Sequence, residues 1–192
     1  PVPPFYHDLG CRVHTISCTR SPFHPGSMKA IRQLQELVER EQYDIVHCHT
    51  PVAAFCTRLA CRKLPCKVMY TAHGFHFYKG APLKNWLLFY PAEKLCAHFT
   101  DVLITINKED YALAQRKLKA KQVVYVPGVG IDLSSFAPDQ TGISRQELDI
   151  PVDNRLILSV GELSHRKNHK TLIRAVAGMQ HTTVMIAGTG AL

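Results

Sequence analysis

The stretch Val68-Met69-Tyr70-Thr71-Ala72-His73-Gly74-Phe75-His76-Phe77-Tyr78-Lys79-Gly80 decides how the rest of the chain is interpreted. Its first residues are rich in β-forming side chains, which predicts a buried strand at residues 67–71. The stretch then becomes a glycine-bounded loop that carries histidines, aromatic rings and a lysine. In a parallel α/β sheet, binding and catalytic groups gather where a strand ends and its loop begins. We therefore expect a functional site at this loop.

The composition is that of a globular protein, with 46% hydrophobic and 20% charged residues in 192. The sequence contains no apolar run long enough to cross a membrane and opens without a signal segment. It begins at Pro1, so we expect a fragment or a processed chain. Its seven cysteines include no Cys-x-x-Cys pair, which favours a reducing cytoplasm over a disulfide framework.

The net charge of +8 is concentrated in the first part of the chain. Residues 1–136 hold 17 lysines and arginines against 10 acidic residues, whereas the remainder holds 6 against 5. A solvated basic surface would explain this excess, and so would contact with an anionic membrane or an anionic ligand. No nucleic-acid motif accompanies the charge, so we expect no nucleic-acid partner.

Short apolar runs alternate with amphipathic stretches up to residue 126. The pattern predicts strands at 12–17, 43–48, 67–71, 101–106 and 122–126, and helices at 28–41, 52–63, 83–99 and 108–118. We expect Ser27 and Asn107 to cap helices, Pro91 to kink or split one, and Glu109 and Asp110 to favour a helix dipole. Strands joined by single helices predict a parallel sheet with right-handed crossovers.

Residues 131–153 are polar and include Pro138, Gly142 and Pro151. We place a domain boundary here, with one Rossmann-like domain at residues 1–136 and the start of a second at 137–192. The second part predicts a strand at 156–160, a helix at 168–179 and a strand at 183–187. One βαβ unit cannot cover both faces of a sheet, so we expect this second domain to be incomplete.

Histidines follow two of the predicted strands. His73 is placed either to donate a hydrogen bond to a substrate oxygen or to bond loop carbonyls, and the residues leave both interpretations open. The aromatic residues after it form either a platform for a sugar or part of the core, and we expect at least one phenylalanine to be core. We expect His47 and His49 to point to opposite sides of the extended backbone. Together with His73 and His76 they suggest a zinc site, but the usual structural pattern adds closely spaced cysteine ligands and here only Cys48 lies nearby.

A second candidate site lies between the strand and the helix predicted after residue 155. It reads Gly161-Glu162-Leu163-Ser164-His165-Arg166-Lys167-Asn168. The free N–H groups and positive dipole end of a helix N-terminus, together with two cationic side chains, favour diphosphate binding. The stretch is neither a Walker loop nor Gly-x-Gly-x-x-Gly, and a solvated turn is the alternative. Gly188-Thr189-Gly190 is a weaker candidate for a phosphate loop.

Taken in order, these motifs resemble those of family 4 glycosyltransferases, particularly bacterial exopolysaccharide and capsule enzymes. The matching segments cover nearly the whole chain: 43–51, 70–82, 107–111, 125–132, 159–163 and 167–169. The resemblance implies the GT-B fold, in which two Rossmann-like domains face each other across a cleft. It implies a retaining transfer of a sugar from a nucleotide-diphosphate-sugar bound by the second domain to an acceptor bound by the first, without a metal or another cofactor.

The resemblance also implies roles for individual residues. His73 would be the catalytic histidine near the reacting sugar. The donor diphosphate would be bound by Gly161, Arg166 and Lys167, and the acceptor side would be lined by His49, His76 and Tyr78. Many members have arginine where this chain has Glu162, although a capsule-type subgroup carries glutamate there.

The resemblance further implies parts that this chain lacks and partners that it would meet. The family's paired-glutamate segment should lie beyond residue 192 and its first strand before Pro1, so we expect the chain alone to be inactive. The expected partners are a nucleotide-sugar donor, a lipid-linked sugar acceptor and, peripherally, the anionic inner face of the cell membrane. The alternatives are a nucleotide-sugar epimerase of GT-B fold and a non-catalytic module that binds a ligand or metal.

Overall fold

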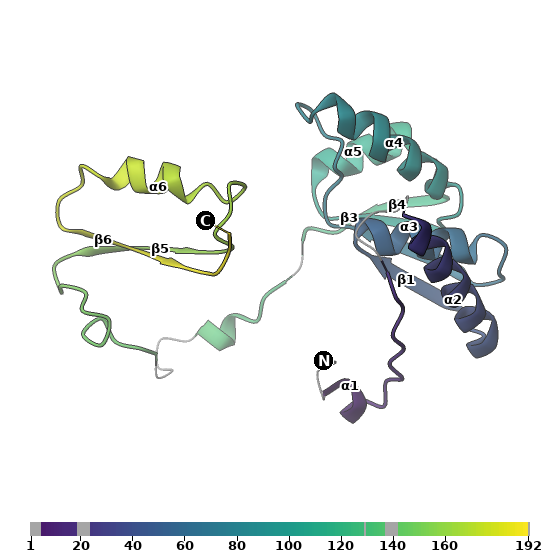
Figure 1. The fold of residues 1–192 in the computed structure, drawn as a ribbon, viewed down its shortest axis with the longest axis horizontal. Coiled ribbons are helices and arrows are strands. Elements are labelled where there is room, and N and C mark those ends of the chain that lie inside the picture. The colour runs from purple at the N-terminus through teal and green to yellow at the C-terminus, as the bar shows by residue number, and fades with distance from the viewer. Residues whose placement is uncertain (1–4, 19–23, 129, 137–141, 192) are drawn as a thin grey trace. The chain divides into compact units, whose positions relative to one another are not determined.

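The computed structural model describes residues 5–18, 24–128, 130–136 and 142–191. The chain separates into two compact units, Pro1–Gly130 and Ile131–Leu192 (Figure 1). The domain division expected from the sequence, between residues 136 and 137, stays a prediction.

The first unit is built on a four-stranded parallel sheet (Figure 1). Its strands, in the order β1-β2-β3-β4, are Ile45–His49, Lys67–Ala72, Val102–Thr105 and Gln122–Tyr125. Three helices connect them in turn: α3 (Pro51–Cys61), α4 (Leu83–Ala97) and α5 (Lys108–Lys117). This confirms the predicted parallel α/β sheet. Because all four strands run the same way, their carboxyl ends meet at one edge.

The core of the first unit lies between the sheet and these helices. Its largest cluster combines β2 and β3 residues with Phe75, Phe77, Ala97 and Ala114. A second cluster lies where α2 (Pro25–Glu41) packs on α3, around Ala30 and Cys56, which are fully buried.

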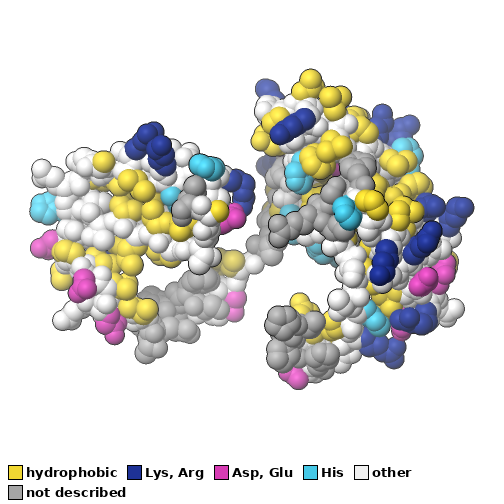
Figure 2. Space-filling model, in the orientation of Figure 1, with side chains coloured by type: hydrophobic (Ala, Val, Ile, Leu, Met, Phe, Trp, Pro, Cys, Tyr) yellow, Lys and Arg dark blue, Asp and Glu magenta, His cyan; other side chains and the backbone are white. Residues whose placement is uncertain are grey.

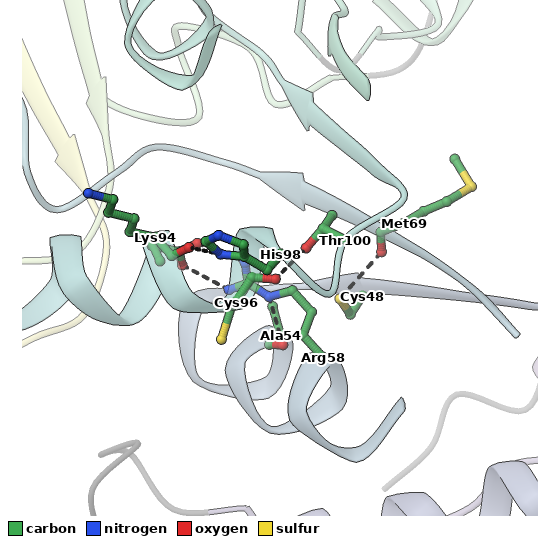
Figure 3. A network of polar contacts seen from close by, with 9 residues as sticks. Cys48, Ala54, Arg58, Met69, Lys94, Cys96, His98 and Thr100 are labelled. Carbon is green, nitrogen blue, oxygen red and sulfur yellow. Dashed lines mark hydrogen bonds and ion pairs between the residues drawn. The ribbon is translucent and has the colours of Figure 1, made fainter. Parts of the chain in front are cut away.

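A buried ion pair joins α3 to α4. Arg58 donates from Nη1 and Nη2 to the two carboxylate oxygens of Glu93 at 2.8 and 3.0 Å. Figure 3 shows the third bond of this guanidinium, from Nε to the Ala54 carbonyl at 3.1 Å. Its guanidinium carbon also lies 4.2 Å from the centroid of the Tyr70 ring. Burial alone would lower the pKa of Arg58, but the Glu93 carboxylate more than offsets this and raises it. The pair therefore stays charged and ties two helices to β2.

Two local predictions need correction, and one alternative is excluded in a third. Residues 12–17 form no strand, because none of the described strands pairs with them, and Ile16 packs against the α2–α3 cluster instead. Helix α2 begins at Pro25, and the Nδ1 atom of His24 caps it by accepting from the Gly26 N–H at 3.0 Å. Ser27 is therefore buried inside the first turn and is not the cap. Helix α4 continues through Pro91 without being split.

In its described residues, the second unit contains a two-stranded parallel sheet and two short helical segments. The sheet consists of β5 (Arg155–Val160) and β6 (Thr182–Ala187), and the helical segments are η1 (Leu133–Phe136) and α6 (His169–Val176). The remaining short helix, α1 (Phe5–Asp8), belongs to the first unit. Every residue of α6 is described and none is buried, and Leu158 and Val160 of β5 are exposed. One helix on two strands leaves much apolar surface uncovered, as the sequence pattern indicated.

Candidate functional site

Three histidines meet at the carboxyl edge of the first sheet. His49 Nδ1 lies 3.0 Å from His73 Nε2, and the rings of His47 and His49 are 4.4 Å apart. His47 Nε2 lies 2.9 Å from Thr71 Oγ1 of the neighbouring strand. His47 and His49 therefore share one face of β1, and the expectation that they point to opposite sides is wrong. Positions two apart in a strand lie on the same face, and Cys48 between them points into the core.

The contact between His49 and His73 restricts where protons can be. Only one proton can lie between two ring nitrogens, so one imidazole donates and the other accepts. Burial lowers the pKa of His49, and the neighbouring His47 and His73 rings lower it further. A neutral His49 can hold the exposed His73 ring in one orientation and one tautomer, as a partner of a catalytic histidine does.

The backbone after His49 is strained. Thr50 has φ 62° and ψ 143°, a combination that is rare for β-branched residues, and Pro51 starts α3 directly after it. Strain of this kind persists where the surrounding structure fixes it, and it is concentrated at functional sites. The sharp turn ends β1 at His49 and leaves its ring at the sheet edge.

Side chains alternate along the loop that follows β2. Phe75 and Phe77 are buried, with ring centroids 4.9 Å apart, whereas His76 and Tyr78 are exposed. Both phenylalanines are therefore core residues, which decides between the two interpretations left open by the sequence. The exposed side chains remain as the surface that the loop offers to a ligand. His76 also lies against Phe89 of α4, with ring centroids 4.6 Å apart.

The first turn of α5 holds this loop by its backbone. Asp110 Oδ2 accepts from the Phe75 N–H at 3.2 Å, and Glu109 Oε1 accepts from the Lys79 N–H at 3.3 Å. Asn107 caps α5, as predicted, by accepting from the Asp110 N–H at 2.8 Å, and it donates to Asp110 Oδ2 at 2.7 Å. The acidic residues expected to favour the helix dipole thus also position the loop, which the sequence did not reveal.

Helix α4 holds the loop from its other side. Asn85 Nδ2 donates to the His76 carbonyl at 2.9 Å, and Trp86 Nε1 donates to the Tyr78 carbonyl at 3.3 Å. A cavity of about 30 Å³ lies beneath the loop, lined by residues that include His76, Phe89 and Glu93. This volume suits a water molecule and not a sugar ring, so a sugar would have to bind on the exposed side of the loop.

The turn after β5 brings two of its three candidate residues together. The aliphatic part of Lys167 lies over Gly161, where an added Cβ would contact Lys167 Cε at 3.5 Å. Arg166 instead faces Glu162, with Nη2 and Oε2 3.5 Å apart and both side chains largely exposed. An exposed pair of this kind is weak, so Arg166 can turn to another anion. His169 of α6 braces the turn, with Nε2 3.2 Å from the Glu162 carbonyl oxygen.

The glycines after β6 have a structural role in this unit. An added Cβ at Gly188 would collide with the carbonyl of Gly161, and one at Gly190 would collide with the backbone of Leu163. Gly161 and Leu163 donate N–H groups to the carbonyls of Ala187 and Thr189, each at 2.9 Å. Close approach of two backbones therefore explains both glycines.

Among the described residues, no group of three or more His, Cys, Asp or Glu side chains is placed to hold a metal ion. Within the same ranges, no helix has the length and apolar character needed to span a membrane.

Comparison with known proteins identifies relatives over most of the chain. The family model described as a glycosyl transferase 4-like domain matches residues 1–128. EpsD of Bacillus subtilis (strain 168), named as a glycosyltransferase, is 42% identical over 93% of this chain and 50% of its own length. The Escherichia coli UDP-Gal:alpha-D-GlcNAc-diphosphoundecaprenol alpha-1,3-galactosyltransferase is 30% identical over 73% of this chain and 38% of its own length. The chain thus spans half or less of these relatives.

Solved structures share the fold at low sequence identity. Sucrose-phosphate synthase from Thermosynechococcus elongatus has a TM-score of 0.72 and 19% identity, covering 92% of this chain and 46% of that one. Anabaena Alr3699/HepE in complex with UDP has a TM-score of 0.68 and 19% identity, covering 98% and 50%. These likenesses show that the fold is of the GT-B type, and the family match identifies the lineage. The chain belongs to the family 4 glycosyltransferases.

Proposed function

We propose that this chain is part of a retaining glycosyltransferase that moves a sugar from a nucleotide-diphosphate-sugar to a lipid-linked acceptor in exopolysaccharide or capsule synthesis. The observation that carries the proposal is the His49–His73 pair at the carboxyl edge of the sheet in a chain of this family. The E. coli relative, whose name specifies a UDP-sugar donor and a diphosphoundecaprenol acceptor, supports the choice of substrates. We place the reaction in the cytoplasm, at the inner face of the membrane.

The first unit would bind the acceptor and position the reacting groups. His73 is exposed and is held by His49, so its second ring nitrogen is available to a sugar hydroxyl or a departing oxygen. His76 and Tyr78 face solvent on the same loop and would contact the acceptor. Asp110 and Glu109 fix the loop backbone, so the loop side chains are positioned before the substrate arrives.

The second unit would bind the departing nucleoside diphosphate. A charge develops on the diphosphate as the glycosidic bond breaks, and fixed positive groups stabilise it. Lys167, whose aliphatic part lies over Gly161, would supply an ammonium group, and the N-terminus of α6 would add backbone N–H groups. Arg166 would join them by leaving Glu162, to which only an exposed ion pair holds it.

The test is radiolabelled sugar transfer by the whole protein with Lys167→Ala. We expect at least a 100-fold loss of kcat, the usual effect of removing one electrostatic contact to a developing charge. The matched control is Arg155→Ala, which removes an exposed cation at the start of β5, the strand end away from the turn, and should leave the rate unchanged. Wild-type turnover by Lys167→Ala would exclude the diphosphate site.

Two product measurements test the proposal further, one for retention of configuration and one against the epimerase alternative. A retaining transferase keeps the anomeric configuration of the donor sugar in the product, which NMR of the purified product reports. An epimerase would release an epimerised sugar with no acceptor present, and that outcome would contradict the proposal. We also expect no transfer by the 192-residue chain alone.

A further inference from the structure

Helix α4 presents an exposed face that combines leucines with lysines. At about 100° per residue, the exposed positions fall within an arc of about 140° around the helix axis. The positions on this face, including the residue that follows the helix, are Leu83, Lys84, Leu87, Leu88, Pro91, Lys94, Leu95 and His98. Leu83 and Leu87 are 73% and 71% exposed, and Leu95 and Leu88 are 52% and 47% exposed. We call these eight residues the α4 outer face.

The α4 outer face carries positive charge and no negative charge among its described residues. The one acidic residue of α4, Glu93, points the opposite way and is buried in the ion pair with Arg58. Figure 2 shows hydrophobic side chains next to Lys and Arg side chains on the part of the first unit where α4 lies in Figure 1. Single exposed leucines are common, but four on one helix face mark an interaction surface.

We propose that the α4 outer face lies on an anionic lipid bilayer. Leucines on one helix face gain free energy by entering the boundary between headgroups and acyl chains, and flanking lysines pair with anionic headgroups while their stems stay in the apolar layer. The excess of 17 basic over 10 acidic residues in positions 1–136 attracts the same kind of surface from a distance. An acidic protein partner would satisfy the lysines but not so broad a row of leucines.

The helix that carries this surface also holds the loop at residues 73–80, which we propose binds the acceptor. In that respect the inference rests on the proposed function. Asn85 and Trp86, on the side of α4 away from the bilayer, bond the carbonyls of His76 and Tyr78. A helix with its side chains is about 10–12 Å thick. A bilayer under the α4 outer face would therefore hold the loop at residues 73–80 about one helix diameter above the depth that the leucines reach, close to the lipid headgroups and within reach of a lipid-linked diphosphate sugar.

The experiment is co-sedimentation of this 192-residue chain with vesicles at low salt. We expect binding to vesicles of phosphatidylcholine mixed with phosphatidylglycerol and little binding to phosphatidylcholine alone. The double variant Leu83→Ser/Leu87→Ser should weaken binding to the vesicles at least about tenfold, because it removes two leucine side chains that would enter the boundary between headgroups and acyl chains. Lys84→Gln/Lys94→Gln should weaken it about tenfold through loss of headgroup attraction. The matched control Leu9→Ser/Leu133→Ser, which replaces leucines 72% and 74% exposed elsewhere, should leave binding unchanged.

Trp86 gives a second readout because it is the only tryptophan in the sequence and lies on α4. Its emission should change when anionic vesicles are added to the wild-type chain and not when they are added to the leucine variant. Circular dichroism checks that each variant is folded.

Three results would overturn the inference. One is absence of binding to anionic vesicles, and another is binding that is indifferent to the leucines. The third is self-association that Leu83→Ser/Leu87→Ser abolishes in a chain that does not bind vesicles, which would make the face a contact between copies. Vesicle binding requires no sugar transfer, so failure of the Lys167→Ala test would leave this result standing.

Discussion

Replacement of Glu93 by alanine tests the buried ion pair that joins α3 to α4 and lies against Tyr70 of β2. The variant leaves the Arg58 guanidinium in place, 1% exposed, next to the Ala54 carbonyl and the Tyr70 ring, with the two donors that bound Glu93 unpaired. Breaking a buried pair by removing one partner costs about 3–5 kcal/mol. Because domains of this kind are stable by about 5–15 kcal/mol, the first unit should lose a large part of its stability.

The assay is urea unfolding followed by the fluorescence of Trp86, which reports on the first unit alone. With a urea m-value of about 2 kcal/mol per molar, Glu93→Ala should lower the unfolding midpoint by about 2 M. The double variant Arg58→Met/Glu93→Leu removes both charges and should recover most of this loss, because two apolar side chains pack without a buried charge.

A surface pair gives the matched control for this experiment. Arg12 is 78% exposed and pairs with Glu41 at the surface. Arg12→Ala breaks this pair and should leave the urea unfolding midpoint unchanged. The reasoning is refuted if Glu93→Ala unfolds at the wild-type midpoint, or if the double variant is no more stable than Glu93→Ala.

Three further predictions concern titration and the loop. Imidazole NMR should show His49 titrating below the usual value of about 6.5, and His73→Asn should raise that midpoint only in part, since burial is the larger cause of the lowered pKa. The bond from Lys121 and then that from the Val68 N–H lower the pKa of Asp101. Its folded pKa lies below its unfolded value of about 3.9, so its contribution to stability is present above that pH and is lost as the pH falls through the folded value. Urea midpoints measured between pH 5 and pH 3 should therefore fall less in Asp101→Asn than in wild type. Asp110→Ala should speed hydrogen exchange at the Phe75 amide about tenfold, because that amide loses its buried acceptor, and an unchanged rate would remove Asp110 from the loop anchors.

The sheet could be predicted from the sequence because its signal is local and repeated. Each strand is a short apolar run and one helical stretch separates each strand from the next, which permits few arrangements other than a parallel sheet. Asn107 is a common cap residue, so the sequence predicts the start of α5. Histidine is not a common cap residue, so the sequence does not reveal that His24 caps α2, although proline is frequent at the first helical position that Pro25 occupies. Residues 12–17 have the alternation of a strand, but alternation does not supply a neighbour to pair with.

The site was predicted less completely because its contacts join distant parts of the sequence. His73 and the loop were recognised from their place after a strand, yet the contact to His49 depends on the register that pairs His49 with Thr71. The hydrogen bond from the Phe75 N–H to Asp110 joins residues that are 35 positions apart in the sequence, and no local sequence pattern predicts it. The glycines at 188 and 190 resembled a phosphate loop because glycine serves both ligand approach and backbone approach, and the sequence does not distinguish the two.

The most direct test of the account is the rate of sugar transfer by the whole protein carrying His73→Ala. The account predicts a loss of at least about 100-fold in kcat with nucleoside diphosphate binding unchanged, because it proposes that His73 acts at the reacting sugar and that the other unit binds the diphosphate. The matched control is His14→Ala, which changes an exposed histidine outside the site and should transfer at the wild-type rate. Transfer at the wild-type rate by His73→Ala would contradict the assignment of the site.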